Sequence, residues 1–308
     1  MPFDLRGWLW RCIPASVIVK LRWARKIYRR HHYYADKVFA RDTGLTRSDL
    51  ESAFRQAGLK EDDLVLVHSA MSGLGLIQGG AETVIRALLD VITPSGTLAM
   101  PTFTVSGSML EYAQSGEMFD VRKTPAKTGK LTEIFRCHPN VLRSLHPTHS
   151  VASLGARAAW LTEDHHRCTT PFGSGSPFAK LIEAHGKILC VGVEISYITS
   201  YHAFEDQMPH FPEQVYLPGA FTLPVRDAEG NQTHVVTRIH DPQLSPRRIE
   251  KRPEVLKQIK DYLVKTGRLK SVQTGKGFIH LVGAQELNVA MGEMLERGIT
   301  IYRRRQEN

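Results

Sequence analysis

A histidine and a glutamate three residues apart are the side chains in this sequence best suited to moving a proton. His202 and Glu205 follow an apolar strand predicted over residues 187–193. On a helical turn, a spacing of three places both side chains on one face, where they can meet. A carboxylate on one imidazole nitrogen fixes the tautomer and raises the basicity of the ring, which suits a general base for an amine or hydroxyl nucleophile. The alternative is a surface His–Glu pair without a catalytic role.

Two further histidines lie in a polar stretch. His146 and His149 flank Pro147 and Thr148, and Ser150 follows directly. Proline holds the backbone extended, and an extended segment can present its polar groups to a site. Ordinary loop polarity explains the same residues equally well.

Metal binding is not predicted. His165 and His166 are adjacent and point apart, and no carboxylate cluster supports them or Cys168, whereas zinc sites need three or four convergent ligands. The four cysteines, at positions 12, 137, 168 and 190, form no C-x-x-C pair, so neither a zinc ribbon nor a disulfide framework is indicated. A reducing, cytoplasmic setting fits this usage. Cys190, inside an apolar strand, is interpreted as a small core residue.

Residues 63–104 are predicted to form the first unit of the fold. This fold must position the histidines and the glutamate described above. An apolar run at 64–67 indicates a buried strand, glycines at 73, 75, 79 and 80 form a loop, and a helix at 81–92 leads to a strand at 97–100. Such a unit offers backbone N–H groups and a helix N-terminus to an anion such as a pyrophosphate. The glycine spacing is one residue too long for a dinucleotide fingerprint, so a nicotinamide cofactor is disfavoured. Alternatively, the glycines only allow the chain to make a tight turn.

Further periodic segments complete an α/β pattern. Residues 48–51 form a capping box for a helix at 46–57, and residues 105–127 are expected to be a long loop over a site. A hairpin across the turn at 227–230 is expected to make the sheet mixed. The remaining expected helices are 128–136, 156–162, 177–185, 253–266 and 284–297, and the remaining strands are 151–154, 187–193, 215–226, 232–239 and 278–282.

Charge separates an N-terminal arm from the body. Of a formal net charge of +9, residues 1–42 carry ten Lys and Arg against three Asp, which is +7, and they also contain Trp8, Trp10 and Trp23. A basic, aromatic arm can lie on an anionic membrane surface or pack on the body or a partner subunit. Nucleic-acid binding is disfavoured, because the body has no matching basic motif. No apolar run approaches the roughly 20 residues needed to cross a bilayer.

Several motifs, in order over about residues 45–295, resemble the aminoglycoside 3-N-acetyltransferase family. They are H-S-A-M-S-G-L-G at 68–75 with G-G-A at 79–81, P-x-G-T-L at 94–98 with M-P-T at 100–102, G-K-L-T-E-I-F-R at 129–136, R-S-x-H-P-x-x-S at 143–150, P-F-G at 171–173 with G-S-P at 175–177, and T-S-x-H-x-x-E at 199–205.

The resemblance implies a three-layer α/β/α sandwich around a mixed sheet, spanning residues 43–300 after the arm. It implies acetyl-CoA as donor and an amine of an amino sugar or aminoglycoside as acceptor, without a metal. His202 would be the base, Glu205 its orienter and Ser150 a partner of the thioester oxygen, in a direct transfer without an acyl-enzyme. The resemblance leaves open whether the protein forms a homodimer. The residues implied to line the CoA channel are His68, Ser69, Met71, Ser72, Gly73, Thr102 and His146.

The sequence departs from the antibiotic-modifying members of this family near His202. They carry a His-Asp pair and an Asn where this chain has Ile195, Ser196 and Ile198, and a serine where it has Ala70. An amino sugar of surface-glycan or secondary metabolism is therefore an expected acceptor beside aminoglycosides. Acidic residues at 111, 117, 194, 206 and 213 are candidates to replace the lost charge. The alternatives are a CoA- or glycan-binding scaffold without turnover, and an acyltransferase that uses another acyl-CoA.

Overall fold

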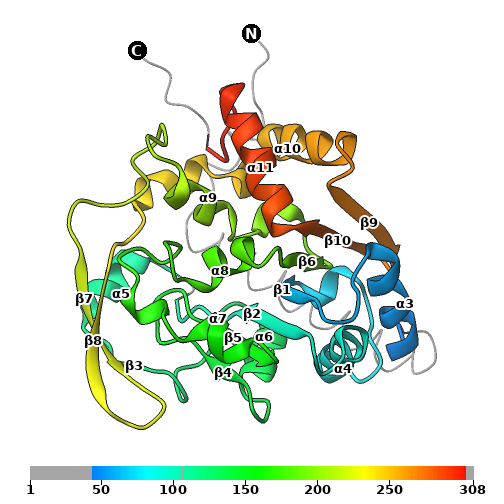
Figure 1. Ribbon diagram of the computed structural model, residues 1–308, viewed down its shortest axis with the longest axis horizontal. Helices are drawn as coiled ribbons and strands as arrows, with labels where there is room; N and C mark the ends of the chain where they lie inside the picture. The colour runs from blue at the N-terminus through cyan, green and yellow to red at the C-terminus, as the bar shows by residue number, and fades with distance from the viewer. Residues whose placement is uncertain (1–43, 106, 303–308) are drawn as a thin grey trace, which may run out of the picture. The chain divides into compact units, whose positions relative to one another are not determined.

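A seven-stranded mixed sheet forms the centre of the computed structural model, which describes residues 44–105 and 107–302 (Figure 1). The basic arm predicted over residues 1–42 lies outside the described residues. The order of the strands is β4-β5-β2-β1-β6-β10-β9, in which β1 runs parallel to β2 and β6 while β5 and β10 are antiparallel to their neighbours. The strands are β1 (Leu64–Ser69), β2 (Thr97–Pro101), β4 (Leu142–Arg143), β5 (Val151–Gly155), β6 (Lys187–Val191), β9 (Leu269–Thr274) and β10 (Gly277–Gly283).

Helices cover both faces of this sheet, because its central strands are apolar on both sides. Val65 and Val67 of β1 pack with α3 (Arg47–Ala57), α4 (Ala81–Ile92) and α6 (Lys130–Arg136). Leu64 and Leu66 face the opposite cluster. That cluster holds residues of α7 (Ala158–Thr162), α8 (Pro177–Glu183), α9 (Tyr201–Gln207), α10 (Pro253–Lys265) and α11 (Ala284–Glu296). The predicted three-layer α/β/α sandwich around a mixed sheet is confirmed.

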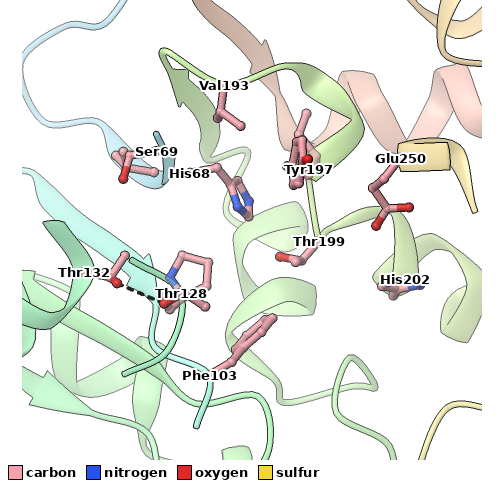
Figure 2. Close-up of a pocket in the computed structure, with 13 residues that line it drawn as sticks. His68, Ser69, Phe103, Thr128, Thr132, Val193, Tyr197, Thr199, His202 and Glu250 are labelled. Carbon is pink, nitrogen blue, oxygen red and sulfur yellow. Dashed lines mark hydrogen bonds between the residues drawn. The ribbon is translucent and has the colours of Figure 1, made fainter. Parts of the chain in front are cut away.

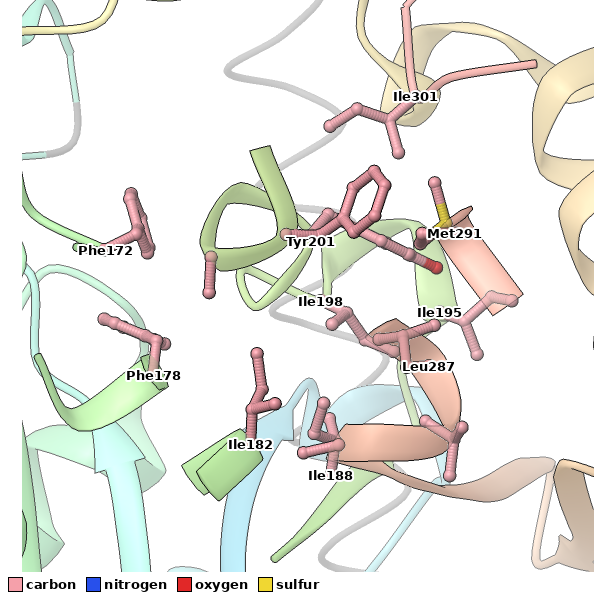
Figure 3. Packing of buried hydrophobic residues seen from close by; sticks show 14 of the residues in the cluster. Phe172, Phe178, Ile182, Ile188, Ile195, Ile198, Tyr201, Leu287, Met291 and Ile301 are labelled. Atoms are coloured by element: carbon pink, nitrogen blue, oxygen red, sulfur yellow. The ribbon is translucent and has the colours of Figure 1, made fainter. Parts of the chain in front are cut away.

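Figure 3 shows part of the cluster that holds α8, α9 and α11 against β6. Ile182 of α8 and Ile188 of β6 belong to the same cluster as Leu287 and Met291 of α11, and Met291 lies next to Tyr201 of α9. Tyr201 is 2% exposed. Apolar packing of Tyr201 therefore fixes the start of α9. The residue after Tyr201, His202, lies at the edge of the core.

The predicted hairpin is present but does not belong to the central sheet. Strands β7 (Phe221–Arg226) and β8 (Gln232–Thr237) pair with β3 (Phe119–Asp120) in a separate three-stranded sheet. The expectation that the hairpin makes the main sheet mixed is wrong, since β5 and β10 do so. The expectation that residues 105–127 form one long loop is also wrong. That segment contains β3 and α5 (Met109–Ser115), which Ser108 caps by accepting a hydrogen bond from the backbone of Glu111.

Two local features differ from the sequence analysis. Helix α3 is capped by Thr46 and Asp49, each side chain accepting from the other's backbone N–H, rather than by a box at residues 48–51. Strand β9, at the sheet edge beside β10, has no counterpart in the sequence analysis. Among the helices of the described residues, none is long and apolar enough to cross a membrane.

Candidate active site

A pocket of about 280 Å³ opens at the carboxyl ends of three adjacent parallel strands, β2, β1 and β6. Ligand sites of open α/β sheets collect at this edge. Figure 2 shows His68 and Ser69 across the pocket from Tyr197, Thr199, Glu250 and His202. The lining residues are Val67, His68, Ser69, Pro101, Phe103, Thr128, Thr132, Val193, Tyr197, Ile198, Thr199, His202 and Glu250.

His202 and Glu205 form a pair on the first turns of α9. Nδ1 of His202 lies 2.8 Å from Oε2 of Glu205. The imidazole lines the pocket, whereas Glu205 is 4% exposed and lies behind it. Oε2 of Glu205 also accepts a hydrogen bond of 3.1 Å from the hydroxyl of Tyr302. Because Nδ1 is engaged, Nε2 is the ring nitrogen left to meet a substrate.

Burial governs the protonation of this pair. It raises the pKa of the Glu205 carboxyl to about 8, against the hydrogen bond from Tyr302 and the charge of Arg248. Burial also holds the pKa of His202 well below its usual value. When Glu205 is protonated, it donates to Nδ1 and Nε2 carries the ring proton. When Glu205 is ionised, Nδ1–H donates to it and Nε2 has a free lone pair. The ionised carboxylate is thus the form in which Nε2 of His202 can accept a proton.

Ser150 and Thr102 are brought together, but neither lines the pocket. Both are completely buried. The Ser150 hydroxyl donates to the carbonyl of Thr102 at 2.7 Å and accepts from Nε of Arg143 at 3.0 Å. The guanidinium of Arg143 also donates to the carbonyls of Thr102 and Thr124. These contacts join the end of β2 to the segment before β5, directly behind the pocket wall at Pro101 and Phe103.

His146 is also completely buried and does not line the pocket. Its ring stacks on that of His165, with centroids 4.3 Å apart, and Nε2 lies 3.3 Å from the hydroxyl of Thr237 in β8. His146 therefore connects the central sheet to the small one. The sequence motif around it has a packing role in this structure.

The loop after β1 divides into two parts. His68 and Ser69 line the pocket, and burial lowers the pKa of His68 to about 4, so this ring is neutral near pH 7. Met71–Gly73 forms a short 3₁₀ helix, η1, that does not line the pocket. A Cβ on Gly73 would lie 2.0 Å from the carbonyl oxygen of Gly192. The glycine is needed because the loop passes directly against the end of β6.

Sequence reasoning missed several pocket residues. Glu250 belongs to the 3₁₀ helix η5 (Ile249–Lys251), and Tyr197 to the 3₁₀ helix η3 (Ile195–Tyr197). Tyr197 is 57% exposed. No motif surrounds Glu250. Tyr197 stands just before the motif at 199–205, among positions where the chain departs from the family pattern, and that departure was the one sequence signal near it. His240 is a further case: it does not line the pocket, but its ring centroid lies 4.5 Å from that of His202.

The chain is similar to known acetyltransferases over most of its length. The family model described as aminoglycoside 3-N-acetyltransferase matches residues 66–296. Aminoglycoside N(3)-acetyltransferase III from Salmonella sp is 28% identical over 257 residues, which cover 79% of this chain and 88% of that protein.

Solved structures with the same fold include two aminoglycoside acetyltransferases. AAC(3)-Xa superposes with a TM-score of 0.73 at 25% identity, covering 84% of this chain and 95% of that one. AAC-IIIb in a binary complex with CoASH superposes with a TM-score of 0.68 at 26% identity, covering 85% of this chain and all of that one.

Proposed function

The chain belongs to the aminoglycoside 3-N-acetyltransferase family, and we propose that it transfers the acetyl group of acetyl-CoA directly to an amine, with His202 as general base. The observation that carries the proposal is the His202–Glu205 pair, which presents an imidazole to a pocket at the carboxyl ends of the parallel strands. The relative whose structure holds CoASH supports acetyl-CoA as donor.

The base has a defined task in this reaction. An ammonium has no lone pair and cannot attack a thioester, so the acceptor must react as the free amine, after its ammonium proton has been lost to solvent. As the amine nitrogen bonds to the carbonyl carbon it becomes cationic, and Nε2 of His202 accepts the proton that it sheds; the C–S bond breaks as the tetrahedral intermediate collapses. The proton on His202 then passes to the departing thiolate. Glu205, hydrogen-bonded to Nδ1, holds the ring orientation and stabilises the imidazolium that forms.

Direct transfer is favoured by the state of the buried thiols. Burial raises the pKa of Cys168 to about 11, and it raises the pKa of Cys190 still further. A thiol is a nucleophile only as its thiolate. Both are therefore neutral and unreactive near pH 7, and neither lines the pocket. Two-substrate kinetics should accordingly give intersecting lines rather than the parallel lines of an acyl-enzyme mechanism.

We place acetyl-CoA along the end of β1. His68 and Ser69 would contact it in the pocket, opposite Thr128 and Thr132 of the segment that begins α6. The short helix Met71–Gly73 would continue the same surface outside the pocket. Thr102 and His146, expected to line the CoA channel, and Ser150, expected to meet the thioester oxygen, are buried, so their proposed role is to hold the pocket wall rather than to touch the donor.

The proposed acceptor is an amino sugar or aminoglycoside, held by Glu250. Three of the five acidic candidates are engaged elsewhere: Glu194 accepts from Lys260, Asp206 from Tyr216, and Glu213 from Arg247. The other two, Glu111 and Glu117, do not line the pocket. Glu250 lines the pocket and has no hydrogen-bond or ion-pair partner among the described residues. A carboxylate left free beside the base suits a second ammonium of the acceptor.

The proposal is tested by incubating the purified full chain with acetyl-CoA and a panel of amino sugars and aminoglycosides. Thiol release and the mass of the product are followed together, because thioester hydrolysis also releases thiol. An acetylated amine formed in step with the thiol supports the proposal. A scaffold role is indicated if no amine yields product although CoA raises the melting temperature, and a donor other than acetyl-CoA is found by repeating the assay with longer acyl-CoAs.

A further inference from the structure

A third ligating side chain stands beside the His202–Glu205 pair. His240 follows β8 in a segment that pairs with Tyr216, and its ring stacks between those of Tyr216 and Phe172. One ligating atom from each of His202, Glu205 and His240 lies within 4.8 Å of the others. All three residues are buried, at 8%, 4% and 8% exposed.

We propose that His202, Glu205 and His240 form a binding site for one zinc-type divalent ion, and that a bound ion switches the acetyltransferase off. The inhibition rests on the proposed function, whereas the binding does not. Two imidazoles and one carboxylate are a donor set that zinc accepts, with a fourth position left for water.

Two buried atoms of this cluster lack a partner. Oε1 of Glu205 and Nε2 of His240 have no hydrogen bond among the described residues, although both are shielded from solvent. Leaving such an atom unpaired is unfavourable, because the atom has lost its hydrogen bonds to water and has gained none in the fold. An ion bonded to both atoms would satisfy them at once. Each belongs to a side chain whose other contacts hold it in place: Glu205 to His202 and Tyr302, and His240 to its aromatic neighbours.

The distances between the three ligating atoms are close to those around a bound zinc ion. Three atoms within 4.8 Å of one another can all lie within about 2.8 Å of a central point, whereas zinc bonds to nitrogen and oxygen measure about 2.0 to 2.2 Å. Side-chain shifts of less than about 1 Å would therefore close the site. The helical turn that carries two of the three ligands does not have to move.

Metal binding and base catalysis exclude each other at His202. If the ion takes Nε2, it occupies the lone pair that would accept the proton from the amine. If it takes Nδ1, the ring proton must sit on Nε2, and the lone pair is again lost. Inhibition is therefore expected whichever nitrogen of His202 binds.

A nearby cation keeps the affinity moderate. The charge of Arg248 acts on His202, Glu205 and His240 alike. It opposes a second cation at the same place, so binding should be reversible by a chelator rather than permanent. That behaviour suits a regulatory site better than a structural one.

The experiment titrates the chelator-treated full chain with Co²⁺ alone and records the visible spectrum, in which four-coordinate Co²⁺ absorbs far more strongly than the aqueous ion. Wild type, His240→Phe and Glu205→Gln are compared, with His149→Phe as the matched control. His149 is a buried histidine beside the cluster that is not one of the three ligands. Phenylalanine at 240 keeps the stacking with Phe172 and Tyr216. Melting temperatures confirm that each variant is folded.

The site is supported if wild type binds one equivalent of four-coordinate Co²⁺ and Zn²⁺ displaces it. The affinity for Co²⁺ should fall more than about 100-fold in both ligand variants, but not in His149→Phe. Zn²⁺ should then inhibit acetyl transfer by wild type, and His240→Phe should turn over without inhibition. Absence of the Co²⁺ spectrum, or the same spectrum in folded His240→Phe, overturns the site. A Co²⁺ site in a protein that acetylates no amine overturns the proposed function and leaves the site standing.

Discussion

The hydroxyl of Tyr302 donates a 3.1 Å hydrogen bond to Oε2 of Glu205, the same oxygen that lies 2.8 Å from Nδ1 of His202. The two residues are 97 positions apart in sequence. Tyr302 is 3% exposed and packs in the cluster that contains α9 and α11. The last described segment of the chain thus fixes the carboxylate that orients the proposed base.

Tyr302→Phe should lower kcat/KM by about 3- to 10-fold, since it removes one hydrogen bond from the carboxylate and leaves the ring packing unchanged. Glu205→Gln should cost more, because a neutral amide cannot stabilise the imidazolium. Steady-state kinetics at one pH gives both numbers. The positioning role fails if Tyr302→Phe alters the melting temperature but leaves kcat/KM at the wild-type value.

Glu250→Gln should raise the KM of an acceptor with several ammonium groups by about 2- to 5-fold, since a single exposed ion pair is worth no more than about 1 kcal/mol. The KM of acetyl-CoA should not change. Glu254→Gln is the matched control, because Glu254 carries the same charge in the first turn of α10 outside the pocket. Equal effects of the two variants would mean that long-range charge, not a contact, attracts the acceptor.

Gly73→Ala should destabilise the fold by about 1 to 3 kcal/mol, because its Cβ would meet the carbonyl oxygen of Gly192 at 2.0 Å. Gly292→Ala is the control. Within helix α11 its Cβ would lie 3.9 Å from the ring of Phe204, an ordinary contact, and alanine favours a helix by about 0.5 to 1 kcal/mol. Urea unfolding measures both. A neutral Gly73→Ala would show that the loop does not need its close approach to β6.

The contribution of His165 to stability should fall as the pH is lowered from 7 to 5. Burial lowers the pKa of His165 to about 3, and its two ring nitrogens lie within hydrogen-bond distance of Ser144 and the carbonyl of Pro171. The unfolded chain protonates this ring near pH 6.5 and the folded chain does not, so acid favours unfolding by about 2 kcal/mol at pH 5 for this one ring. His68, whose pKa is lowered to about 4, acts in the same direction.

The test is urea unfolding at pH 7 and pH 5 for wild type and His165→Gln. The variant starts less stable, but its loss between the two pH values should be smaller than that of wild type by about 2 kcal/mol. The same loss in both proteins would show that His165 does not remain neutral in the fold.

Local signals predicted most of the fold well. Helix α4 occupies Ala81–Ile92, the predicted range, because its apolar spacing and flanking Gly80 and Pro94 all agree. Strand β9 was missed because it lies at a sheet edge, where Lys270 and Gln273 are exposed and the apolar alternation is broken. The sequence also could not predict which strands pair. Nothing in residues 221–237 shows that this hairpin pairs with β3 instead of joining the central sheet.

The site divides in the same way. The spacing of His202 and Glu205 predicted a pair on one helical face, because both belong to one turn. Tyr302, His240 and Glu250 come from distant segments, and only tertiary packing brings them to that turn. The role of Ser150 beside the thioester oxygen stays a prediction. The sequence could not show that its hydroxyl donates to the carbonyl of Thr102, because the two residues are 48 positions apart and only the fold brings them together.

The measurement that bears most directly on the central claim is the rate of acetyl transfer by His202→Ala. With an amine that wild type acetylates, the variant should lose at least about 100-fold in kcat, the usual minimum for a general base, while acetyl-CoA still raises its melting temperature. Transfer within a few-fold of the wild-type rate, by a folded variant that binds acetyl-CoA, would show that His202 is not the base.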